Sequence, residues 1–188
     1  MSIVEKVKRL SVEDYLAQER DGDVRHEFIA GEIYAMVGAS RSHNLIASNL
    51  HAALHSHLRG SPCRVFMNDM KVRIGGSDRF YYPDIMVSCS RIEDEPDEFY
   101  ETLPVVIIEV LSPSTAMRDR LEKRFAYQRL ASLQEYVLVT QDVMQVEIYR
   151  RLTDGWEREM CRDDDKINLQ AIGFELPLQV IYEGIPTS

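Results

Sequence analysis

Residues 103–123 read LPVVIIEVLSPSTAMRDRLEK, and this stretch decides the fold of the chain. Positions 104–111 are almost all β-branched or aliphatic, with one carboxylate among them, Glu109. Because apolar side chains occupy both faces, the pattern predicts a central strand that is buried from above and from below. An ionised carboxylate without a partner in such a strand would cost on the order of several kcal/mol. The sequence therefore predicts a metal ion or a lysine beside Glu109.

A break and a helix follow this strand. Ser112-Pro113-Ser114-Thr115 ends the strand, and Ser114 or Thr115 is placed to cap the helix, with Asp119 in its first turns. The helix carries two stripes at helical spacing, one of Asp119, Lys123, Ala126, Tyr127 and Leu130, and one of Met117, Leu121 and Phe125. The first stripe is charged near the strand, so we expect Lys123 to point toward Glu109.

A second carboxylate, Asp84, lies upstream in Tyr82-Pro83-Asp84. Since proline has no backbone N–H to donate to a sheet, Pro83 marks the entry of a strand and puts Asp84 at its end. Carboxylates on neighbouring strands form the hard-oxygen sites that Mg²⁺ and Mn²⁺ prefer. Asp84 and Glu109 are therefore the candidate metal ligands.

The order of these motifs resembles a known family. A proline-aspartate step followed by a glutamate in an apolar strand looks like the PD-(D/E)XK nuclease superfamily, which has the restriction-endonuclease-like fold. More closely, the chain is similar to the Uma-type putative restriction endonuclease family of small bacterial proteins, from about residue 10 to about residue 150. The segments that carry this similarity are EFIAGE at 27–32, Ser42-His43, Tyr82-Pro83-Asp84, EVLSPST at 109–115, Asp119 through Lys123, and Glu135-Tyr136.

The resemblance implies an α/β (α+β) fold, with a mixed β-sheet core flanked by helices and extra antiparallel hairpins. It also implies metal-dependent cleavage of phosphodiester bonds. The superfamily usually has its lysine two residues after the glutamate, where this chain has Leu111, so the resemblance implies that Lys123 takes that role from the helix. It makes Glu27 a third acidic member of the site or a partner of Lys123. Without the family resemblance, Glu27 would be interpreted as an exposed strand residue.

The longest predicted helix covers residues 42–59 and contains several histidines. His51 and His55 lie one turn apart, but no acidic general base stands between them as in metalloproteases, so a zinc site is set aside. His43 lies at the helix N-terminus, where it either contacts a phosphate or is a plain helix-start residue.

Lys71 and Arg73 share one face of a predicted strand over residues 69–74. Two interpretations stay open for them, a solvated outer face or a pair of phosphate contacts beside Asp84. The acidic segment 91–101 lacks apolar periodicity and predicts a loop, whose charge would repel nucleic acid.

The remaining patterns predict a helix and several strands. Ser11 followed by Asp14 caps a helix over residues 11–19. Strands are expected at 25–29, 32–37, 64–67, 80–88, 135–140, 143–150 and 156–161, with turns at Ala30-Gly31 and at residues 75–78.

Composition sets outer limits on the function. A chain of 188 residues that is 45% hydrophobic fits one domain, residues 1–188. The net charge of −9 opposes tight non-specific binding of nucleic acid, which needs a basic surface, although a local patch and a bridging metal can offset it. Neither a signal peptide nor a membrane-spanning run is expected.

The three cysteines, Cys63, Cys89 and Cys161, are odd in number and far apart. Their spacing predicts neither a disulfide framework nor a zinc site, and it favours a reducing, cytoplasmic setting.

Three hypotheses follow for the function. The first is a Mg²⁺- or Mn²⁺-dependent endonuclease acting on nucleic acid, most simply DNA, and assembled as a homodimer by analogy with the superfamily. The second is an inactive binding module in which Lys123 neutralises Glu109, and the third is a metal-dependent hydrolase of a small phosphate ester. Clustering of Lys71, Arg73, Arg118, Arg120 and Arg124 around the two acidic residues would favour a polynucleotide.

Overall fold

The computed structural model describes residues 9–36, 38–113 and 115–186. Two positions used above, Ser114 as a helix cap and Val37 as the end of a strand, lie outside these residues.

The centre of the molecule is a six-stranded mixed sheet in the order β11-β10-β9-β8-β6-β3. Strand β8 pairs in parallel with β9 and antiparallel with β6, and the other pairs are antiparallel. The strands are β3 (Arg64–Met67), β6 (Ile85–Ser88), β8 (Pro104–Leu111), β9 (Glu135–Thr140), β10 (Gln145–Leu152) and β11 (Gly155–Arg162). The predicted central strand is confirmed as β8, with the predicted bounds.

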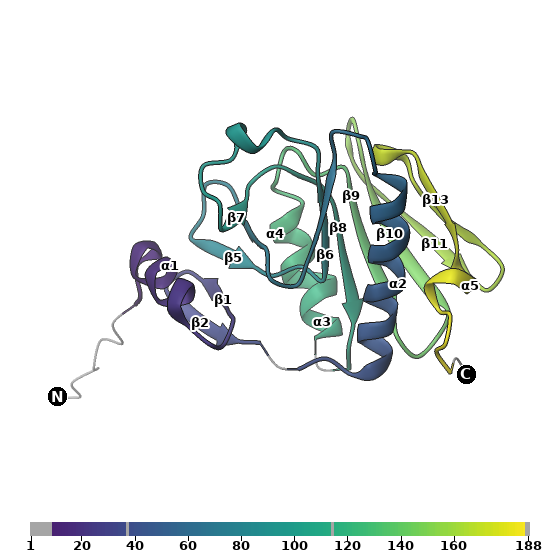
Figure 1. Cartoon of the computed structure of the whole chain (residues 1–188), viewed down its shortest axis with the longest axis horizontal. Coiled ribbons are helices and arrows are strands. Elements are labelled where there is room, and N and C mark those ends of the chain that lie inside the picture. The colour runs from purple at the N-terminus through teal and green to yellow at the C-terminus, as the bar shows by residue number, and fades with distance from the viewer. Residues whose placement is uncertain (1–8, 37, 114, 187–188) are drawn as a thin grey trace.

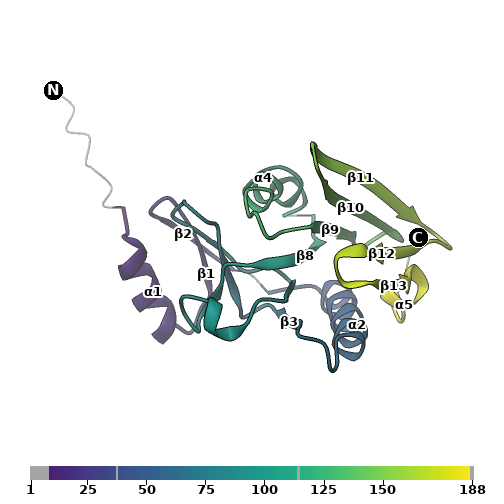
Figure 2. The same ribbon diagram turned by 90° about the horizontal axis from the view of Figure 1, so that it is seen from above.

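Helices cover both faces of this sheet (Figures 1 and 2). Helix α2 (Arg41–His57) packs on one face. The other face carries the expected helix, in which α3 (Ala116–Arg118), a π-helical turn (Asp119–Lys123) and α4 (Arg124–Tyr127) follow one another without a gap. Side chains alternate along β8, because Val106, Ile108 and Val110 face α2 while Ile107 and Leu111 face α4.

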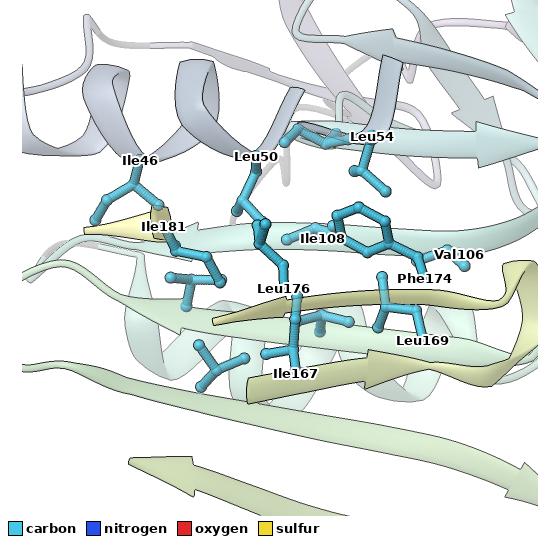
Figure 3. Packing of buried hydrophobic residues seen from close by; sticks show 14 of the residues in the cluster. Ile46, Leu50, Leu54, Val106, Ile108, Ile167, Leu169, Phe174, Leu176 and Ile181 are labelled. Atoms are coloured by element: carbon cyan, nitrogen blue, oxygen red, sulfur yellow. The ribbon is translucent and has the colours of Figure 1, made fainter. Parts of the chain in front are cut away.

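The α2 side of the core is completed by the C-terminal part of the chain. The hairpin of β12 (Lys166–Leu169) and β13 (Phe174–Pro177), followed by α5 (Leu178–Ile181), packs against α2 and β8. Figure 3 shows the side chains that meet there. Those labelled are Ile46, Leu50, Leu54, Val106, Ile108, Ile167, Leu169, Phe174, Leu176 and Ile181.

A second, five-stranded sheet lies beside the first, in the order β2-β1-β5-β4-β7 (Figure 1). Its strands are β1 (His26–Ile29), β2 (Glu32–Ala35), β4 (Lys71–Arg73), β5 (Arg79–Tyr81) and β7 (Tyr100–Glu101). Helix α1 (Val12–Asp21) packs on it through Tyr15, whose ring stacks on Phe28 at 4.7 Å between centroids. The predicted Ser11 cap is confirmed, because its side chain accepts a hydrogen bond from the Asp14 N–H.

The expected single strand over residues 80–88 is wrong. It is two strands, β5 in the small sheet and β6 in the large one, separated at Tyr82-Pro83-Asp84. Proline cannot donate to a ladder, so pairing is interrupted there and the chain crosses from one sheet to the other. Asp84 therefore lies at the junction of the two sheets. The predicted loop 91–101 also differs slightly, since it contains a 3₁₀ turn (Ile92–Asp94) and ends in β7.

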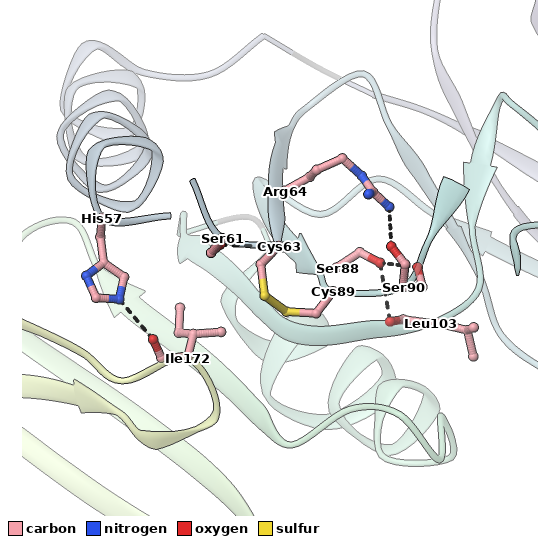
Figure 4. Close-up of a disulfide and its surroundings, with 9 residues drawn as sticks. All are labelled: His57, Ser61, Cys63, Arg64, Ser88, Cys89, Ser90, Leu103 and Ile172. Atoms are coloured by element: carbon pink, nitrogen blue, oxygen red, sulfur yellow. Dashed lines mark hydrogen bonds between the residues drawn. A yellow bond between two sulfur atoms is a disulfide. The ribbon is translucent and has the colours of Figure 1, made fainter. Parts of the chain in front are cut away.

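The expectation that the cysteines are unpaired is wrong for two of them. Cys63 and Cys89 form a disulfide, shown in Figure 4, and Cys161 is free and buried. The antiparallel register of β3 and β6 places Arg64 opposite Ser88, so the residues next to them become neighbours. Sequence spacing does not reveal such a register, and the cysteines no longer argue for a reducing compartment.

No helix among the described residues has the length and apolarity needed to cross a membrane.

Candidate functional site

A cavity of about 490 Å³ lies where the two sheets, the start of α2 and the π-helical turn meet. Its walls hold most of the acidic and basic residues singled out from the sequence. The residues lining it are Glu27, Tyr34, Ala35, Met36, Gly38, Ala39, Ser40, His43, Asn44, Ala47, Asn68, Tyr82, Asp84, Glu109, Val110, Ser112, Pro113, Thr115, Arg118, Asp119, Lys123 and Gln141.

Glu109 is buried in β8 and held by two donors. Lys123 Nζ lies 3.0 Å from its Oε1, and the Tyr127 hydroxyl donates to the same oxygen over 2.9 Å. Burial raises the pKa of Glu109 well above its usual range, and Lys123 opposes this rise while nearby carboxylates add to it. Burial also lowers the pKa of Lys123, but Glu109 and the other carboxylates outweigh it and raise the pKa above its ordinary value. Lys123 is therefore a protonated lysine, and its predicted contact with Glu109 is confirmed.

Two further carboxylates share Lys123. Glu27 Oε1 lies 3.0 Å from Nζ, and Asp119 Oδ1 lies 3.5 Å from it. Arg118 binds the second oxygen of Glu27 at 2.8 Å. Glu27 is 5% exposed, so the exposed-strand interpretation is wrong and the partnership with Lys123 is confirmed. Burial raises the pKa of Asp119 as well.

Asp84 faces the same cavity from the start of β6. Its Oδ2 accepts a hydrogen bond from the backbone N–H of Val110 over 2.7 Å and lies 3.2 Å from His43 Nε2. Burial lowers the pKa of the His43 ring, but its contacts with Asp84 raise the pKa above the ordinary histidine value. The backbone bond to Val110 ties Asp84 to the strand that carries Glu109, so the two carboxylates are fixed relative to each other.

The cavity holds more negative than positive charge. Four carboxylates line it (Glu27, Asp84, Glu109 and Asp119), while its lysine and arginine side chains are Lys123 and Arg118. A buried surplus of negative charge is relieved either by protons or by a cation.

The oxygens available to a cation fit magnesium. Asp119 Oδ1 is buried without a hydrogen-bond donor, and both donors to Glu109 use Oε1 rather than Oε2. Within the part of the chain that the structure describes, no group of three or more His, Cys, Asp or Glu side chains forms a ready-made metal site. Mg²⁺ commonly binds through one or two carboxylates and takes its other ligands from water and substrate phosphate. The donor set therefore fits Mg²⁺ or Mn²⁺ better than a metal that needs a cage of protein ligands.

Five of the residues proposed from the sequence line this cavity: Asp84, Glu109, Lys123, Glu27 and His43. Lys71 and Arg73, on β4 of the small sheet, are not among the lining residues. Lys71 is 5% exposed, with its Nζ 5.4 Å from the Tyr82 ring, so a solvated outer face is wrong for it. Arg73 lies over Phe80 and donates to the Tyr100 hydroxyl.

The expected cluster of cations does not form around the cavity. Among the five arginines and lysines named for it, only Arg118 lines the walls that the structure describes. Arg120 pairs with buried Glu147 at 2.9 Å, and Arg124 lies over Tyr149 at 4.8 Å. Any phosphate bound in this cavity would therefore be held largely by other groups.

The candidate residues did not include three side chains of the site: Asp119, Tyr127 and Gln141. Asp119 and Tyr127 had a usable signal, because each lies four positions from Lys123 on one stripe of the helix. Gln141 had none, since it comes to the cavity only through the parallel pairing of β9 with β8.

Comparison with known proteins agrees with this architecture. The Uma2 family, described as "Putative restriction endonuclease", matches residues 12–179. Two uncharacterised proteins of Synechocystis sp. (strain ATCC 27184 / PCC 6803 / Kazusa) are similar: slr1290 is 34% identical, covering 94% of this chain and 93% of its own, and sll1609 is 35% identical, covering 82% and 88%.

Among solved structures, a putative nuclease belonging to DUF820 from Anabaena variabilis ATCC 29413 superposes with a TM-score of 0.76 at 20% identity, over 92% of this chain and 97% of that one. At this identity the superposition shows a shared fold. The family match covers both sheets and every residue of the cavity, and the chain belongs to the Uma2 family of putative restriction endonucleases.

Proposed function

We propose that this chain is a divalent-metal-dependent nuclease that hydrolyses phosphodiester bonds in DNA. The observation that carries the proposal is the surplus of buried carboxylates around one protonated lysine, at the junction of the two sheets. Family membership supports the nuclease class, and the charge surplus supports the metal.

Asp84 and Glu109 would hold Mg²⁺ or Mn²⁺. When bound, such an ion polarises the phosphate and lowers the pKa of a bound water. Asp84 is positioned for this by the Val110 N–H, which fixes one of its oxygens and leaves the other for a ligand.

Lys123 would stabilise the negative charge that develops on the phosphate, or orient the attacking water. Glu27, Glu109 and Asp119 hold its ammonium in place, so little reorganisation is needed when the substrate arrives. His43, held against Asp84 through Nε2, would bring positive charge close to a bound phosphate. Lys71 and Arg73 lie outside the cavity, and for them a contact with a more distant phosphate remains a prediction.

In the wider superfamily the cutting of both strands of a duplex often uses two sites, so the proposal includes a homodimer. Sedimentation of the protein with and without duplex DNA measures this directly.

The test of the nuclease proposal is cleavage of plasmid and single-stranded DNA by the wild type and by two isosteric variants, Asp84→Asn and Glu109→Gln, with Mn²⁺, Mg²⁺ or EDTA. We expect metal-dependent cleavage by the wild type and at least a ~10²-fold loss in each variant, the magnitude typical of losing a main electrostatic contribution. A folded variant that cleaves as fast as the wild type contradicts the assignment. Thermal unfolding in the same buffers reports metal binding, since a ligand at about 100 times its Kd adds roughly 2.7 kcal/mol.

Two observations favour other functions, and the same experiment tests them. The Lys123–Glu109 pair with Leu111 in the usual lysine position favours an inactive binding module. If the wild type shows no cleavage and its unfolding temperature does not change with metal, the inactive binding module is supported. The shortage of cations around the cavity favours a small phosphate ester, so p-nitrophenyl phosphate belongs among the substrates.

A further inference from the structure

The N-terminal turn of α2 opens beside the catalytic carboxylates. Ser40 caps the helix, because its Oγ accepts the His43 N–H over 3.1 Å and its carbonyl accepts the Asn44 N–H over 3.0 Å. The first helical amides, those of Arg41 and Ser42, have no acceptor within the helix. No acidic side chain stands in the first turn to offset the positive end of the helix dipole.

A buried amide side chain meets this turn from the large sheet. Gln141 follows directly after β9, is 6% exposed and lines the cavity together with Ser40. Its Oε1 accepts a hydrogen bond from Ser40 Oγ over 2.7 Å. Since Ser40 Oγ already accepts the His43 N–H, its own proton is free to be donated, which orients the amide with its oxygen toward Ser40.

This orientation leaves the Nε2 group of Gln141 without a partner. Among the described residues, none accepts a hydrogen bond from it, although the side chain is more than nine-tenths buried. Its nitrogen is not among the fully buried polar atoms that lack a partner, so it is accessible from the cavity that Gln141 lines. A ligand oxygen in the cavity would satisfy this donor.

We propose that Gln141 and the first turn of α2 form a phosphate-binding subsite beside the carboxylates. The subsite rests on the proposed function for its ligand, a backbone phosphate adjoining the scissile one. Neutral donors at a helix N-terminus bind phosphate without basic side chains. These neutral donors would therefore bind phosphate in a cavity whose lysine and arginine side chains are Lys123 and Arg118. The chain as a whole has a net charge of −9.

Two substitutions isolate the amide. Gln141→Glu keeps the size of the side chain and the oxygen that accepts from Ser40, but it replaces the free donor by a negative charge. Gln141→Leu removes the donor without adding charge. The matched control is Gln134→Glu, which makes the same charge change just before the opposite end of β9, at an exposed side chain bonded to the Ser132 carbonyl.

The experiment measures binding to the full chain in EDTA, with inorganic phosphate by calorimetry and a fluorescein-labelled DNA hairpin by anisotropy. We expect Gln141→Glu to weaken both by about tenfold or more, because hydrogen bonds to a charged ligand contribute roughly 1.5–3 kcal/mol. Gln141→Leu should weaken both less, and Gln134→Glu should match the wild type. Unfolding temperatures establish that each variant is folded.

Several outcomes decide the matter. Equal phosphate affinity in the wild type, Gln141→Glu and Gln141→Leu overturns the subsite, and so does a wild type that binds no phosphate. Binding that depends on Gln141 without any metal-dependent cleavage supports the subsite while refuting the nuclease. Binding of phosphate and adenosine monophosphate but not of the hairpin supports the subsite and assigns it to a small ester.

Discussion

At the scale of single residues, Lys123 reaches Glu109 from a helix, whereas the resemblance places a lysine within the strand. Leu111 occupies the usual lysine position, is 3% exposed and packs against the residues beneath β8. Lys123 instead reaches Glu109 from the helix that follows, over 3.0 Å. The helical stripe predicted this contact, because Lys123 lies on the same side as Ala126 and Tyr127, which pack on the sheet.

Removing Lys123 should be strongly destabilising. In Lys123→Met the carboxylates of Glu27 and Glu109 lose a buried partner, which typically costs about 3–5 kcal/mol. We expect urea denaturation to show this loss, and Lys123→Met combined with Glu109→Gln to recover part of it. If the double variant is as unstable as the sum of the two single ones, the pair is not coupled.

Glu101 should make stability depend on pH. Its side chain is 7% exposed, with Oε2 buried and unpaired, and burial is the main cause that raises its pKa above 4.5. A group whose pKa is raised on folding favours the folded state below its unfolded pKa and loses that contribution as the pH rises through the folded pKa. Glu101→Gln should therefore melt a few degrees higher than the wild type near pH 8 and no higher near pH 4. Equal melting temperatures near pH 8 contradict this.

At the scale of elements, the sequence predicted the features that depend on residues close together in the chain. The apolar run of β8, the Ser11 cap and the β1–β2 hairpin were all readable from the sequence. The division of residues 80–88 between two sheets was not, because Pro83 marks a local interruption but does not show that the two halves pair in different sheets. The disulfide was missed for the same reason, since it follows from the register of β3 and β6.

The disulfide should contribute measurably to stability. Cys63 and Cys89 are 26 residues apart, and closing a loop of that length corresponds to about 3.5 kcal/mol in the chain-entropy treatment. We expect reductant to lower the free energy of unfolding by roughly this amount. The doubly substituted Cys63→Ala, Cys89→Ala protein is the control, because its stability should not respond to reductant. A wild type that is equally stable with and without reductant contradicts the prediction.

At the scale of the whole molecule, the site belongs to neither sheet alone. The small sheet contributes Glu27, the large sheet Glu109, and the π-helical turn between β8 and β9 contributes Lys123. The chemical types of these residues were predictable from motif order. Their convergence was predictable only through family resemblance, because residues 27 and 123 have no local pattern in common. The absence of the expected cation cluster from the described walls of the cavity was not predictable, since Arg120 and Arg124 are held by Glu147 and Tyr149, which are distant in sequence.

Lys123 also joins the two sheets mechanically. Its ammonium bonds Glu27 on one sheet and Glu109 on the other, each over 3.0 Å. If the α1–β1–β2 segment unfolded alone, Glu27 would move away from Lys123. The buried ammonium of Lys123 would then lose one of its carboxylate partners. Partial opening is thereby penalised, and the sheets are expected to lose structure in one cooperative transition. The polar cluster for which we propose a catalytic role is thus also expected to couple the unfolding of the two sheets.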